Sequence, residues 1–144
     1  SIGEIRSRVR GRMRASPVDL VIVDHLQLVT APGNSNGRVY ELGDITSGLT
    51  RLARDHGVAV LALAQLSRKI EERKDHTPML SDLRDSGNLE QDADVVLMLS
   101  RSDDAERQGT ADLLIAKHRN GPTGLVSFYF DQQTTAFRAL DVGH

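Results

Sequence analysis

The sequence predicts an α/β fold in which a mostly parallel sheet is flanked by helices and followed by antiparallel strands at the C-terminal edge. Two strongly apolar runs, at residues 18–23 and 58–66, are separated by an amphipathic helical pattern. This arrangement indicates a strand, helix, strand unit and therefore parallel pairing. A third apolar run follows at residues 94–101. Beyond it, short apolar segments are joined by turn sequences with no helical pattern between them, which indicates antiparallel pairing.

Two helices are predicted in the first half of the chain. From residue 1 to about residue 14, apolar residues recur at spacings of three and four among arginines, which predicts an amphipathic helix that Pro17 ends. The same periodicity over residues 39–53 predicts a second helix, closed by Gly57. The segment APGNSNGR, which precedes the second helix, is a predicted loop.

The second half is expected to hold a long polar loop and then short strands. Residues 67–81 are polar and charged around Pro78, and a loop of this length is often functional. A short helix is expected within LRDSGNLEQDA, ahead of the third apolar run. The last strands are predicted at ADLLIAKHR, LVSFYF and TAFRAL, with turns at NGPTG and DQQT.

Length and composition favour a single globular domain over residues 1–144. With 39% hydrophobic residues the chain can bury one core, and its net charge of −2 points to no particular polyanionic partner. The absence of cysteine excludes disulfides, thiolate metal sites and cysteine nucleophiles. No apolar run is long enough for a membrane span and no signal-peptide pattern occurs, so a soluble, cytoplasmic protein is expected.

Polar residues close the apolar runs, at the strand ends where ligands gather in open α/β sheets. Asp24 closes the first run, Gln65 closes the second, and Lys117 and Arg119 close the fourth, ADLLIAKHR. A carboxylate at the position of Asp24 suits a Mg²⁺–nucleotide site. A strand-end amide such as that of Gln65 can form a hydrogen bond with a phosphate-bound water. Lys117 and Arg119 alternate along the chain, so both cations can face one phosphate. Each residue also has a plainer interpretation, as a turn aspartate, a polar strand cap or solvated charge.

Other residue types indicate no further site. The five histidines show no metal-ligand spacing, and the serines lack a Gly-x-Ser-x-Gly context. No GxxxxGK[ST] phosphate loop occurs in the 144 residues. The arginine-rich first helix is open to two interpretations, a contact with nucleic acid or a neighbouring subunit, and a solvated face.

Three segments together resemble a known family. They are DLVIVDHLQLV, LALAQLSRKIEERKDHTPMLSDLRDSGNLEQDADVVLMLSR and IAKHRNGPTG. In this order they resemble the C-terminal half of the RecA-like motor domain of the DnaB family of replicative DNA helicases, over about residues 5–140. The resemblance implies a RecA-like fold and a homo-hexameric ring that hydrolyses ATP with Mg²⁺ and moves 5′ to 3′ along single-stranded DNA at the replication fork. Primase and the helicase loader are the partners it implies.

The resemblance also implies roles for the strand-end residues. Asp24 looks like the Walker B aspartate that supports the magnesium ion, through water. Gln65 looks like the glutamine that couples the γ-phosphate to the DNA-binding loops. Lys117 and Arg119 look like the basic finger that reaches the ATP of the neighbouring subunit.

A DNA-binding loop is implied in the central block. Arg84, Asp85 and Gly87 match the family's LR[ED]SG loop, in which arginine supplies charge and the glycine region supplies amide groups to the DNA backbone. Asp85 stands for the commoner glutamate, and His25 stands where the family has tyrosine. Neither departure removes a needed functional group.

The family's phosphate loop and catalytic glutamate would precede residue 1, so the isolated chain is expected to be catalytically inactive. Three hypotheses follow. The resemblance favours part of a replicative helicase. The second hypothesis is a non-enzymatic RecA-like DNA-binding or subunit-interaction module from a truncated gene, because such a protein would have the same residues as a part of a helicase. A related RecA-like ATPase of recombination or timing is disfavoured by SDLRDSGNLEQDADVV.

Overall fold

The computed structural model describes residues 1–32, 37–67, 70, 72–73, 77–86, 88–101 and 109–140, with the backbone alone at residues 84–86. The chain forms two compact units, labelled here unit 1 (Ser1–Arg68 and Asp82–Ala93) and unit 2 (Lys69–Ser81 and Asp94–His144). The single domain expected from the sequence stays a prediction. Among the described residues, no helix has the length and apolar character needed to cross a membrane.

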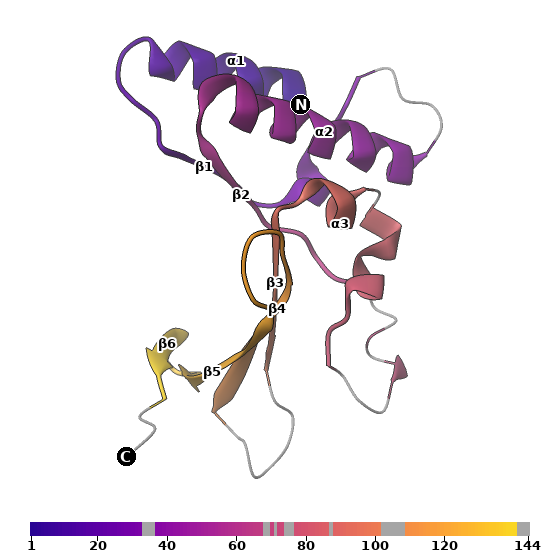
Figure 1. The fold of residues 1–144 in the computed structure, drawn as a ribbon, viewed down its shortest axis with the longest axis vertical. Coiled ribbons are helices and arrows are strands. Elements are labelled where there is room, and N and C mark those ends of the chain that lie inside the picture. The colour runs from indigo at the N-terminus through magenta and orange to yellow at the C-terminus, as the bar shows by residue number, and fades with distance from the viewer. Residues whose placement is uncertain are drawn as a thin grey trace. The chain divides into compact units, whose positions relative to one another are not determined.

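Unit 1 contains a two-stranded parallel sheet packed against helices. Strand β1 (Leu20–Val23) pairs in parallel with β2 (Ala59–Ala62). Helix α2 (Arg38–His56) is the crossover between these strands, and α1 (Ile2–Met13) lies beside α2 (Figure 1). The predicted strand, helix, strand unit is therefore confirmed.

Local sequence explains where both helices begin and end. Helix α1 is capped by Ser1, whose hydroxyl accepts a hydrogen bond from the Glu4 amide in a capping box. Helix α2 ends at Gly57, which adopts the left-handed conformation with φ of 63°. Glycine reaches this conformation without the steric cost of a Cβ atom, so the predicted closure of the helix at this residue is confirmed.

The core of unit 1 lies between α2 and the residues at and beyond the end of β1. Helix α2 places its buried apolar side chains at spacings of three and four, as a helix with one buried face does. Side chains from α1 and β2 pack against this cluster and are partly buried. The buried members of the cluster are Val23, Leu26, Val29, Leu42, Ile45, Leu49 and Leu52.

The opposite face of the parallel sheet is exposed in the described part of the chain. Leu20 is 50% exposed and Ile22 is 59% exposed, and Leu61 on β2 is exposed as well. A nearly continuous apolar run is typical of a strand buried on both faces of a parallel sheet, whereas in the described residues these strands bury only one face. The reason is that the buried cluster formed with α2 and α1 lies on one face only.

Short helical turns follow the strands of unit 1. The 3₁₀ helix η1 (Leu26–Leu28) follows β1. A 3₁₀ helix, η3 (Leu80–Ser86), and a single turn of α-helix, α3 (Leu89–Asp92), occupy the segment in which a short helix was expected. The buried Thr46 hydroxyl of α2 donates a hydrogen bond to Asp92 Oδ2 at 2.5 Å, which ties α3 to α2.

Unit 2 contains a four-stranded antiparallel sheet in the order β3–β4–β5–β6. Its strands are β3 (Val95–Arg101), β4 (Thr110–His118), β5 (Gly124–Asp131) and β6 (Ala136–Ala139). The predicted antiparallel C-terminal strands are confirmed. The sequence groups β3 with the parallel core, whereas the structure pairs it antiparallel with β4. The segment between the two strands is too short for a parallel crossover, which needs a dozen or more residues.

Candidate nucleotide site

The carboxyl ends of β1 and β2 bring Asp24 and Gln65 to the same edge of the sheet in unit 1. Asp24 directly follows β1, and Gln65 follows β2 after Leu63 and Ala64. Backbone pairing continues beyond the strands, because the Leu63 amide donates to Val23 O and the Leu26 amide donates to Leu63 O, both at 2.9 Å. The two predicted residues therefore lie at neighbouring strand ends, where an α/β sheet binds ligands.

Asp24 presents an open carboxylate. Its side chain is 73% exposed, and its recorded ionic neighbour is His25, with Nδ1 lying 3.8 Å from Asp24 Oδ1. The peptide between these two residues is cis. In the described part of the chain, no group of three or more His, Cys, Asp or Glu side chains could enclose a metal ion. A single exposed carboxylate such as that of Asp24 is the kind of protein ligand that Mg²⁺ takes when it keeps most of its water shell.

The main chain of Gln65 is held by the side chain of Gln27. Gln27 Nε2 donates to Gln65 O at 3.2 Å, and Gln27 Oε1 accepts from the Gln65 amide at 3.3 Å. Within the described residues, the side-chain amide of Gln65 makes no hydrogen bond, and Gln65 is exposed. Sequence reasoning missed Gln27. The signal that could have found it is an amide inside the otherwise apolar turn LQL.

Arg38, in the first turn of α2, holds the turn that carries Gln27. Its guanidinium donates to three main-chain carbonyl oxygens, those of Leu26 at 3.3 Å, Gln27 at 2.8 Å and Val29 at 3.1 Å. The planar fork of an arginine suits this task, because it presents several donors in fixed directions. Arg38 was also missed at the sequence level.

Glu41 fixes the orientation of Arg38. Its Oε2 accepts from Arg38 Nη1 at 2.5 Å, and its Oε1 accepts from the Ala31 amide at 3.0 Å. Both hydrogen bonds lower the pKa of Glu41 from its ordinary value of 4.5, and the bond from the Ala31 amide has the larger effect. The carboxylate therefore stays charged at neutral pH and joins α2 to the segment after η1.

The predicted DNA-binding loop begins in η3. The backbone of Arg84 and Asp85 belongs to this helix, and Gly87 lies outside the described residues. Just before them, the buried Asp82 accepts a hydrogen bond at its carbonyl oxygen from the Ser67 amide at 3.3 Å. The segment is therefore tied to the chain that follows β2. Its contact with DNA stays a prediction.

Lys117 and Arg119 belong to unit 2. Lys117 lies on β4 opposite Val96, and Arg119 follows the end of the strand. The Arg119 amide donates to Asp94 O at 2.8 Å, and Arg119 Nη1 lies 2.5 Å from Asp94 Oδ1. Asp94 is a partner that sequence reasoning did not identify. The finger role of the two cations stays a prediction.

The turn after Arg119 is packed against the His118 side chain. A Cβ atom at position 121 would lie 2.2 Å from His118 Cε1, so a larger residue there would require the His118 ring to move. The His118 Nδ1 atom also lies 3.3 Å from Pro122 O, in hydrogen-bond contact. The predicted NGPTG turn between β4 and β5 is confirmed.

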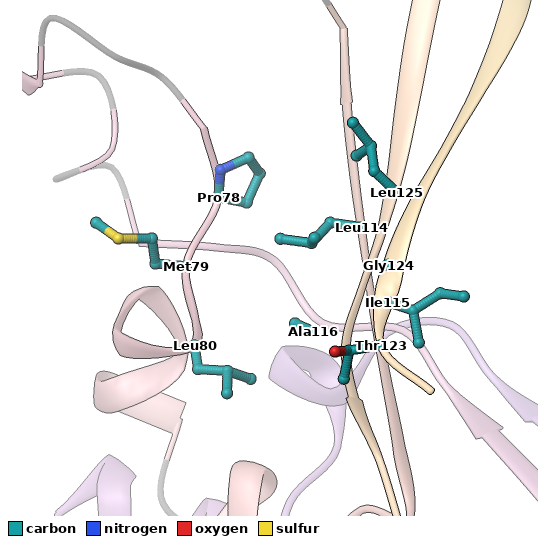
Figure 2. A pocket seen from close by; sticks show the side chains of 9 residues that line it. All are labelled: Pro78, Met79, Leu80, Leu114, Ile115, Ala116, Thr123, Gly124 and Leu125. Atoms are coloured by element: carbon teal, nitrogen blue, oxygen red, sulfur yellow. The ribbon is translucent and has the colours of Figure 1, made fainter. Parts of the chain in front are cut away.

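A cleft in unit 2 is apolar. It has a volume of about 490 Å³ and lies between the segment Pro78–Leu80 and strands β4 and β5 (Figure 2). Its lining includes Leu114, Ile115 and Leu125 and contains no charged side chain. It therefore has none of the groups that nucleotide chemistry requires, and its size does not make it the candidate site.

Parallel strands that end in Asp24 and Gln65 define an α/β domain of the class that binds ligands at its strand ends. The chain belongs to the DnaB-like helicase C-terminal domain family, whose sequence profile matches residues 1–139. It is 41% identical over 162 residues to the replicative DNA helicase DnaB of Rickettsia prowazekii, a match that covers 98% of this chain and 33% of that protein. The chain thus spans about a third of this relative, and the family resemblance is confirmed.

Two solved structures share the fold. A DnaB-like replicative helicase, described together with its interactions with primase, has a TM-score of 0.90 and 41% identity and matches 98% of this chain and 36% of its own. A second solved structure, of an ATPase domain, has a TM-score of 0.89 and 40% identity, with 98% of this chain and 52% of its own matched. The predicted RecA-like α/β fold class is confirmed by these similarities.

Proposed function

We propose that this chain is part of the motor domain of a replicative DNA helicase. The whole protein would use ATP hydrolysis to move 5′ to 3′ along single-stranded DNA and to unwind the duplex at the replication fork. The observation that carries the proposal is membership of the DnaB-like family over residues 1–139, together with Asp24 and Gln65 at neighbouring strand ends. The similarity to an ATPase domain supports the use of nucleotide.

The strand-end residues would divide the chemistry between them. Asp24 would hold the water shell of Mg²⁺, and the ion, when bound, supplies charge that stabilises the phosphoryl transfer of ATP. Gln65 would bond the γ-phosphate or the attacking water through its exposed side-chain amide. Both roles suit residues whose backbone is fixed by the sheet while their side chains stay open to solvent.

Unit 1 offers a short path from Gln65 to the proposed DNA loop at residues 84–87. Ser67 lies two positions after Gln65, and its amide bonds to Asp82, two positions before the loop begins. A change at the γ-phosphate that moved Gln65 would therefore reach the loop through one hydrogen bond. Arg84, with Asp85 and Gly87, would follow the DNA by its phosphates, which are the same for every base sequence.

Lys117 and Arg119 would serve the neighbouring subunit. In a homo-hexameric ring they would act as the basic finger that stabilises charge on the ATP of the next subunit. We propose primase and the helicase loader as partners. Primase is supported further by a similar helicase whose structure was described together with its interactions with primase. A role at the replication fork would suit a cytoplasmic protein, which is the location we propose.

The test is unwinding and DNA-stimulated ATPase activity of the intact protein. We expect unwinding of forked DNA to require a single-stranded 5′ tail and Mg²⁺–ATP. Asp24→Asn should lower ATP turnover by about 100-fold or more, since a metal ion contributes several kcal/mol to such a transition state. Asp19→Asn is the matched control, because Asp19 is an exposed aspartate at the opposite end of the same strand. Unwinding from a 3′ tail, or equal losses in both variants, would contradict the proposal.

A further inference from the structure

The Gln27 side chain takes the place of a strand partner for Gln65. The backbone pairing of β1 and β2 ends with the bond from Leu26 to Leu63, after which the chain turns away into η1. Gln65 still presents an amide and a carbonyl group on that side, and the Gln27 amide meets both at 3.3 and 3.2 Å. A side-chain amide offers one acceptor and one donor in one plane, so it satisfies both groups at once.

Hydrogen bonds, rather than close packing, hold Gln65 in place. A cleft of about 240 Å³ lies beside the Gln27–Gln65 contact and is lined in part by Arg38, Ser67 and Asp82. The strand end therefore has room to move once the contact is lost. For a group that acts on a reacting phosphate, a displacement on the order of 1 Å costs on the order of 100-fold in rate.

Gln27 is itself fixed before it reaches Gln65. Its carbonyl oxygen accepts from Arg38 Nη2 at 2.8 Å, and its neighbour Leu26 is fully buried in the core. The side chain of Gln27 is therefore presented from a rigid turn and loses little conformational freedom when it makes its two bonds. Shortening this side chain removes the contact with Gln65 while it leaves the buried cluster intact.

We infer that Gln27 is a positioning residue for Gln65, and through Ser67 for the start of the proposed DNA loop. Its two hydrogen bonds set the main chain from which the Gln65 amide reaches the nucleotide. The same strand end continues to the Ser67 amide, which bonds to Asp82 at 3.3 Å. The inference rests on the proposed function of Gln65 in ATP turnover.

The first test measures steady-state ATPase activity of the intact protein with saturating single-stranded DNA. Gln27→Ala should lower kcat about tenfold or more, because Gln65 loses its position. The KM for ATP should move by less than about twofold, since no proposed phosphate- or metal-binding group is changed. The matched control is Gln132→Ala, at an exposed glutamine in the turn between β5 and β6, which should behave as wild type.

A double variant distinguishes positioning from general stabilisation. If Gln27 acts through Gln65, Gln27→Ala should cause no further loss of kcat in a Gln65→Ala background. Multiplied losses, or wild-type kcat in Gln27→Ala, would overturn the inference. Should Gln27→Ala fail to assemble, Gln27→Glu keeps the size and one acceptor but removes the donor to Gln65 O, and wild-type kcat in that variant would overturn it equally. A wild-type protein without DNA-stimulated ATPase activity would instead refute the proposed function, and the inference with it.

Discussion

Replacing Arg38 with alanine should loosen the turn that carries Gln27 without unfolding the rest of the protein. The guanidinium donates to three carbonyl groups, and two of these bonds, to Leu26 and Val29, are partly buried. A hydrogen bond to a charged donor is worth roughly 1.5–3 kcal/mol, and partial exposure reduces each here to about 1 kcal/mol. Losing both bonds should lower the free energy of opening the turn by about 2 kcal/mol. The population of the open turn then rises about 30-fold.

Hydrogen–deuterium exchange of the intact protein measures this opening directly. The amides of Leu28 and Val29 donate within η1 and that of Leu26 donates to Leu63, so a peptide covering residues 24–31 reports on the turn. We expect these amides to exchange about 30-fold faster in Arg38→Ala, while peptides from β4 exchange at the wild-type rate.

The matched control is Arg6→Ala, which removes another arginine of unit 1. Arg6 makes a surface ion pair with Asp55 at 3.9 Å, and such pairs are worth roughly 0–1 kcal/mol. Exchange over residues 24–31 should change by less than about fivefold in this variant. Equal exchange in wild type and Arg38→Ala would show that the three hydrogen bonds to carbonyl groups do not hold the turn. That result would contradict the inference that Gln27 is presented to Gln65 from a rigid turn.

Three further predictions concern the DNA loop and the finger. In the intact protein, Arg84→Ala should weaken binding of single-stranded DNA similarly for all base sequences. It should also reduce the slope of log K against log salt by about one or less, which fluorescence anisotropy can measure. A loss of affinity confined to particular bases would contradict a contact with the phosphates. Arg119→Ala should lower kcat by ~10³-fold or more while ATP binding is largely spared, and wild-type turnover at saturating ATP would refute the finger role. Rings that mix Arg119→Ala with Asp24→Asn subunits should regain some ATPase activity that neither pure ring shows, because both lesions then fall on some interfaces and leave others intact.

Local signals predicted the helices and turns, since these depend on residues that are close in sequence. The period of apolar residues located α1, Gly57 marked the left-handed end of α2, and NGPTG marked the turn between β4 and β5. The partner of a strand is a different kind of information. An apolar run such as β3 suits a parallel or an antiparallel neighbour equally, and here the short connection to β4 decided between them.

The strand-end residues of the candidate site could be predicted from the sequence, but the residues that hold them in place could not. Asp24 and Gln65 stand out because each closes an apolar run, a pattern visible in any sequence of this class. Gln27 and Arg38 act on main-chain groups, so no complementary side chain marks their partners. Gln27 and Gln65 are also 38 positions apart, and no local periodicity links residues at that distance.

The bond between Arg119 and Asp94 is compatible with a finger that leaves its own chain. Both side chains are exposed, at 55% and 70%, and an exposed pair is worth roughly 0.2–1 kcal/mol. A finger that contributes ~10³-fold to phosphoryl transfer gains about 4 kcal/mol in the transition state. If Arg119 has the proposed finger role, a phosphate within its reach would therefore outcompete Asp94 for the guanidinium. The Arg119 amide can keep its bond to Asp94 O at 2.8 Å throughout, so the side chain can change partners while its backbone stays attached to the start of β3.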